Sequence, residues 1–117
     1  MEKEEFVKGL KKAVSDTMVD DIKYTFENIK LDKFPKKKEM ANWFNHLGVA
    51  EKEIVINLIK EVSEKSVFGT LCVLDGVRTI EDTEDKGSFE LYFIKDDKKT
   101  LINTEKGEYL HDLIDFS

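Results

Sequence analysis

The side chains best suited to acid–base chemistry lie near the C-terminus, where His111 is followed by Asp112 and, four residues on, by Asp115. A neighbouring carboxylate can orient an imidazole for proton transfer. A site near His111 and Asp75 would suit a small hydrolase or a ligand-binding domain. A terminal His-Asp pair more often forms a helix cap or a hydrogen-bonded clasp, and we favour this second interpretation.

Metal-ligating side chains are few. His46 is the other histidine, and Cys72, inside an apolar run, is the only cysteine. Because zinc sites usually need three or four ligands from His, Cys or carboxylates, we expect neither a metal site nor a cofactor. Cys72 should be a small buried apolar side chain.

The sequence contains no other motif that indicates catalysis or phosphate binding. Its six glycines are too widely separated to form a phosphate-binding loop, and no serine occupies a nucleophile elbow. Lys36–Lys38 near Trp43 could contact a phosphate backbone, but three lysines on a net-acidic chain usually form a solvated loop. We therefore expect a protein that is not an enzyme, and nucleic acid is a disfavoured partner.

Charge is distributed unevenly along the chain. Residues 1–60 hold 12 lysines and 11 acidic residues, a net charge of +1, while residues 61–117 hold 7 basic and 14 acidic residues, a net charge of −7. An acidic surface attracts basic proteins and accelerates their association. The alternatives are that these charges serve solubility or protect strand edges. The candidate partner-binding residues are carboxylates in predicted loops and in the tail, namely Glu81, Asp82, Glu84, Asp85, Asp96, Asp97 and Asp112.

Apolar residues at helical spacing predict four helices, over about residues 2–16, 17–33, 36–46 and 50–64. A cap at Asp16 or Thr17 would begin the second helix, and the first two could stack as an antiparallel pair. The fourth should be the central helix of the bundle. The residues expected to face inward in the third and fourth helices are Met40, Trp43, Phe44, Leu47, Ile54, Val55, Leu58, Ile59 and Val62.

The apolar run at residues 67–74 follows a polar break at Lys65 and Ser66 and could be a short buried helix or a strand. We favour a helix, because its large apolar residues fall at helical spacing and Asp75-Gly76 is a natural stop. Beyond Gly76 the pattern has a period of two residues.

The alternating pattern predicts strands at about residues 77–82, 88–95 and 100–103, which would form a three-stranded antiparallel meander. The tail should close as a helical turn. The predicted fold is therefore a single α+β domain, residues 1–117, with an N-terminal bundle of four to five helices (about 2–75), a sheet part (about 77–103) and a closing helical turn (about 108–116).

Four segments, Leu71–Val77, Gly87–Phe93, Leu101–Asn103 and Leu110–Leu113, resemble small uncharacterised bacterial proteins, some similar to immunity proteins of polymorphic toxin systems. The resemblance covers about residues 40–117 and involves mostly apolar positions that determine the fold. It implies a protein that binds and blocks a partner, with no catalytic residues to carry over.

These observations predict a non-enzymatic inhibitor or adaptor, most concretely an immunity-type protein that blocks a basic toxin or effector through an acidic C-terminal surface. A homodimer through the sheet residues Tyr92, Ile94 and Ile80 is a further option. The charged N-terminus is unlike a signal peptide, and no apolar stretch approaches the ~20 residues that span a bilayer. We therefore expect a cytoplasmic protein without membrane contact.

Overall fold

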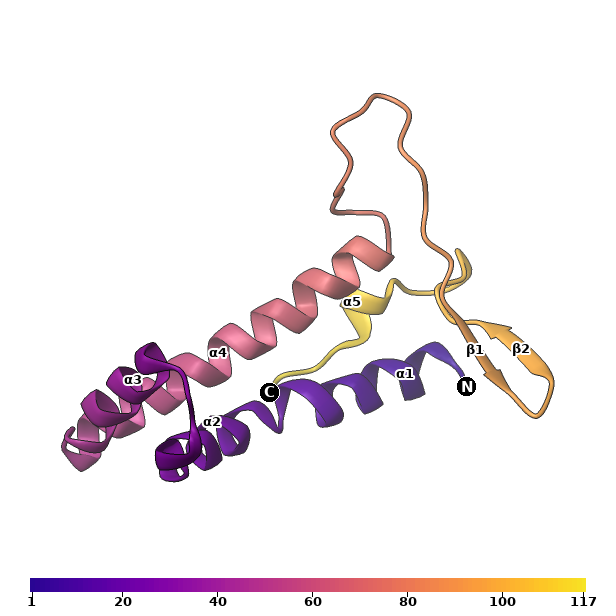
Figure 1. Cartoon of the computed structure of the whole chain (residues 1–117). Coiled ribbons are helices and arrows are strands. Elements are labelled where there is room, and N and C mark those ends of the chain that lie inside the picture. The colour runs from indigo at the N-terminus through magenta and orange to yellow at the C-terminus, as the bar shows by residue number, and fades with distance from the viewer.

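The protein has an α+β fold, as predicted, with four helices of eight or more residues, a two-stranded antiparallel sheet and a one-turn closing helix (Figure 1). The structure is a computed structural model that describes the backbone of residues 1–117 and all side chains except that of Leu31. The elements are α1 (Lys3–Leu10), a π-helical turn η1 (Lys11–Ser15), α2 (Met18–Glu27), a 3₁₀ turn η2 (Ile29–Leu31), α3 (Pro35–Asn45), α4 (Val49–Leu74), β1 (Tyr92–Lys95), β2 (Lys98–Leu101) and α5 (Leu110–Leu113).

The first two helices run end to end through η1, as Figure 1 shows. The amide of Asp16 donates to the carbonyl of Lys11 at 2.9 Å, which is the bond of a π-helical turn. Thr17 does not cap α2 and instead donates its hydroxyl back to the carbonyls of Ala13 and Val14. The expected antiparallel pairing of the first two helices is therefore wrong, and α4 packs against η1 and α2.

The longest element is α4, a single helix of 26 residues that includes the run 67–74. The prediction that residues 67–74 are helical is therefore confirmed. The predicted break at Lys65 and Ser66 is wrong, because the helix continues through both residues. Ser66 continues the helix by donating its hydroxyl to the carbonyl of Val62 at 2.8 Å. The helix stops where the sequence predicts, because Gly76 adopts a φ of +77° and begins a Schellman turn.

The sheet is a hairpin in which Tyr92 pairs with Leu101 and Lys95 with Lys98. The third strand predicted at residues 77–82 is absent. Thr79 forms local hydrogen bonds with both the carbonyl and the amide of Glu81, at 3.0 and 3.1 Å. These bonds replace the ladder bonds that a strand would need.

The core is small and lies where α1, the C-terminal half of α4, the residues after β2 and α5 meet. Its buried residues are Val7, Val67, Leu71, Ile102 and Leu110. Cys72 is also buried, as expected, but it is not part of this cluster.

Several expected core residues lie instead at the surface. Phe44 is buried, but Met40 and Trp43 are 53% and 59% exposed, and α4 exposes Ile54, Leu58 and Val62. The N-terminal half of α4 is therefore not the centre of a bundle.

The whole molecule is open for its size. Its accessible surface is 9231 Å², whereas a compact monomer of 13.6 kDa exposes about 6,600 Å². The radius of gyration is 18.3 Å, against about 13 Å for a compact chain of this length. Much of the apolar side-chain surface is therefore left in contact with solvent.

Candidate functional site

Residues 77–90, which we call the acidic loop, extend away from the helices and the hairpin (Figure 1). Every residue in this loop is exposed, and none lies in a helix or strand. The loop holds five acidic residues and two basic ones, Arg78 and Lys86. A long irregular segment that contributes nothing to the core is typically functional or disordered.

The two ends of the acidic loop are joined by the side chain of Asn103. Its amide nitrogen donates to the carbonyl of Leu74 at 3.0 Å, before the loop, and to that of Phe89 at 2.7 Å, near its end. Its amide oxygen accepts the backbone N–H of Leu91 at 2.8 Å. Sequence reasoning missed Asn103, because a lone asparagine after a strand carries no recognisable signal.

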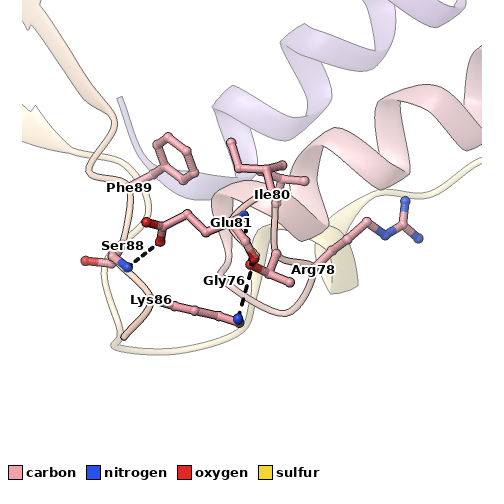
Figure 2. Close-up of a pocket in the computed structure, with 10 residues that line it drawn as sticks. Gly76, Arg78, Ile80, Glu81, Lys86, Ser88 and Phe89 are labelled. Atoms are coloured by element: carbon pink, nitrogen blue, oxygen red, sulfur yellow. Dashed lines mark hydrogen bonds between the residues drawn. The ribbon is translucent and has the colours of Figure 1, made fainter. Parts of the chain in front are cut away.

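Hydrogen bonds within the acidic loop fix its shape, as Figure 2 shows. The carboxylate of Glu81 accepts the amide of Gly87 at 2.6 Å, and the ammonium of Lys86 donates to the carbonyls of Glu81 and Thr83. Glu81 thus organises the loop with its carboxylate. The predicted binding residues Asp82, Glu84 and Asp85 are exposed and form no ion pair among the described side chains.

A pocket of about 350 Å³ lies at the base of the acidic loop, between its two arms and the end of α4 (Figure 2). Arg78, the only arginine, lies against α4 at Gly69, where a Cβ atom would come within 2.5 Å of its Nη1 atom. Gly69 therefore allows the loop to begin close to the helix.

The remaining predicted binding residues lie elsewhere. Asp96 and Asp97 form the turn of the hairpin, which points away from the acidic loop in Figure 1. Asp112 lies in α5, with its carboxylate 3.4 Å from Nε2 of His111. The structure gathers residues 81–85 in one loop and separates the other three carboxylates from it.

His111 and Asp75 do come together, and they form a clasp between α4 and α5. The carboxylate of Asp75 accepts the backbone N–H groups of Leu110 and His111 at 2.9 and 2.8 Å, and it lies 2.6 Å from Nδ1 of His111. The imidazole stacks on Tyr109 and meets the edge of Phe68. Both carboxylate oxygens of Asp75 are thus engaged within the fold.

Two observations bear on a reactive role for this pair. Among the described side chains, no hydroxyl or thiol is hydrogen-bonded to His111. Neither His111 nor Asp75 lines the pocket at the base of the acidic loop. The contacts that the structure shows for this pair are those of a clasp, in which Asp75 holds the start of α5.

An apolar groove of about 580 Å³, which sequence reasoning did not identify, runs between the α1–η1–α2 rod and α4. None of its lining residues is charged. They are Leu10, Val14, Met18, Ile22, Leu58, Ile59, Val62, Ser63, Ser66, Val67 and Thr70.

Only two of the three residues that the sequence suggested for a homodimer interface lie in the sheet. Tyr92 and Ile94 are exposed on β1, but Ile80 lies in the acidic loop and not in the sheet. Lys99 covers the ring of Tyr92, with its ammonium 4.0 Å from the ring centre.

No known protein family matches the chain, and no curated protein or solved structure is significantly similar to it. The resemblance to immunity proteins therefore stays a prediction.

In the described part of the chain, no three His, Cys, Asp or Glu side chains are grouped so that they could hold a metal ion. No described helix combines the length and the apolar character that crossing a membrane requires.

Proposed function

We propose that this protein is a non-enzymatic inhibitor or adaptor, most concretely an immunity-type protein, that binds a basic toxin or effector through the acidic loop. The observation that carries the proposal is that the acidic loop is fully exposed and yet fixed at its base by Asn103. A loop held in one shape loses little conformational entropy when a partner binds.

The charges of the loop support a basic partner. Asp82, Glu84 and Asp85 are exposed within four consecutive residues, and Lys86 next to them is engaged with loop carbonyls. Clustered carboxylates raise the rate at which a basic protein finds its binding site, and salt screens this effect. The protein would then inhibit its partner by covering a basic surface, without a cofactor or a covalent step.

A capture experiment with matched charge reversals tests this proposal. The immobilised chain is exposed to a lysate of its native cell at low salt, and bound proteins are identified by mass spectrometry. The variant Glu84→Lys/Asp85→Lys should lose the captured partner. The control Asp20→Lys/Asp21→Lys changes the net charge equally on exposed residues of α2 and should keep it.

Association rates with the captured partner provide the decisive readout. For the wild-type chain the rate should fall steeply as salt increases, and for the loop variant it should be at least tenfold lower at low salt with a flatter salt dependence. Equal rates for the two charge-reversed variants would refute a role for the acidic loop.

A further inference from the structure

The helical part of the molecule has one covered face and one uncovered face. Leu113 at the end of α5, and Ile114 and Phe116 after it, pack against the core on one side of α1 and α4. The apolar groove lies on other faces of these helices, where no described segment of the chain covers Leu58 or Val62. A helix layer is stable when its apolar face packs against a second layer.

We propose that the apolar groove is the interface of a homodimer, in which a second copy of this chain packs the same groove against the first around a two-fold axis. The interface would be isologous, with the α1–η1–α2 rod and α4 of each copy together forming a four-helix arrangement. This proposal goes beyond the binding of a basic partner and uses a different surface from the acidic loop.

The chain as a whole exposes enough surface for a dimer to bury. The chain exposes about 2,600 Å² more than a compact monomer of its mass. Each subunit of an obligate dimer buries about 1,000 Å² or more. Burial of the groove in a dimer would bring the surface closer to that of a compact protein, even with the acidic loop still exposed.

The charge beside the groove fits a second copy of this acidic chain. Residues 10–22 contain two lysines and three aspartates, and residues 58–70 contain two lysines and two glutamates. The two walls therefore carry a net charge of about −1, although the chain as a whole carries −6. Two copies can meet at this surface without strong repulsion, whereas a basic partner is attracted to the acidic loop instead.

The polar side chains in the groove are compatible with complete burial. The hydroxyls of Ser63, Ser66 and Thr70 donate to carbonyls of their own helix, those of Lys60, Val62 and Ser66, at 2.8 to 2.9 Å. Removing water from the groove would therefore leave none of these three donors unsatisfied. Small residues at these positions also permit helices to approach closely.

Molecular mass in solution tests the proposal directly. We would measure the wild-type chain by sedimentation equilibrium at 5 to 100 µM and expect the mass of two chains at the upper concentrations. The variant Leu58→Glu places a charge in the groove at a side chain that is 60% exposed within one chain, so the fold should survive and the dimer should dissociate at least 100-fold more easily.

A matched control introduces a glutamate on the same helix but outside the groove. Val49, the first residue of α4, is 87% exposed and does not line the groove, so Val49→Glu should leave the mass of two chains unchanged. A single-chain mass for the wild type at 100 µM, or equal association of Leu58→Glu and wild type, would overturn the proposal. A dimer that only Val49→Glu disrupts would also contradict it.

A second measurement needs no variant and remains valid if Leu58→Glu does not fold. Met18 lines the groove, whereas Met40 is exposed outside it. Peroxide oxidation of Met18 should slow several-fold as the protein concentration rises from 1 to 100 µM, while that of Met40 should not change. Equal concentration dependence of the two methionines would refute the groove as the interface.

Discussion

At the scale of single residues, a few polar side chains hold together segments that are distant in the sequence. Asn103 joins both ends of the acidic loop, and Asp75 holds the start of α5. The ammonium of Lys3 donates to the carbonyls of Thr104, Lys106 and Glu108 at 2.6 to 2.8 Å. These side chains provide the long-range bonds that a larger sheet would otherwise supply.

Replacement of Asn103 by Ala should release the acidic loop. The change removes three hydrogen bonds and leaves the half-buried amide of Leu91 without its partner, at a cost of about 1–3 kcal/mol in the free energy of unfolding. Limited proteolysis should cut residues 77–90 at least tenfold faster than in the wild type. The control Asn57→Ala, at an exposed position of α4, should change neither quantity. Unchanged cleavage in Asn103→Ala would show that Asn103 does not hold the loop.

At the scale of elements, the hairpin has an unusual turn. Asp96 and Asp97 both have positive φ angles, +51° and +61°, as in a two-residue turn of type I′. Glycine is preferred at the second of these positions, because an L side chain is strained there. The turn therefore stores strain and places two like charges next to each other.

Replacement of Asp97 by Gly should stabilise the hairpin by about 0.5–1 kcal/mol, because it relieves this strain. The measurement is the urea midpoint, together with slower amide hydrogen exchange in β1 and β2. Asp85→Gly removes the same charge from a residue without a positive φ and should give no gain. A loss of stability in Asp97→Gly would mean that the Asp97 side chain stabilises the turn.

At the scale of the whole molecule, the chain combines a small core with a large accessible surface. Its buried apolar cluster contains five residues, and its dimensions are 50 × 37 × 30 Å. A chain of 117 residues can ordinarily bury about two thirds of its unfolded surface. The second copy is therefore expected to add to the stability of a fold with this shape.

Thermal unfolding should therefore depend on protein concentration. If folding and dimerisation are coupled, a tenfold increase in concentration should raise the Tm by about 3 °C. The measurement is circular dichroism at 222 nm between 1 and 100 µM. The Leu58→Glu variant should show a lower Tm with no such dependence. A wild-type Tm that is independent of concentration would contradict coupled folding and dimerisation.

The sequence by itself determined the features that depend on local chemistry. Apolar spacing indicated the helices and the hairpin strands, and Gly76 marked the end of α4 because it readily adopts a positive φ. The isolated polar residues Lys65 and Ser66 wrongly suggested a break, because their effect on a long helix is small. The sequence placed His111 near Asp75 only as a possible hydrolase or ligand site and expected a clasp with the neighbouring aspartates of the tail, whereas the clasp is formed with Asp75.

Only the tertiary structure decided which apolar faces are covered. Periodicity shows that Leu58 and Val62 share a face of α4, but it does not show whether another element packs on that face. Residues 77–82 alternate like a strand, yet no partner strand lies beside them and local bonds replace the ladder. Burial and strand pairing depend on residues distant in the sequence, so the apolar groove and the clamp at Asn103 appear only in the folded chain.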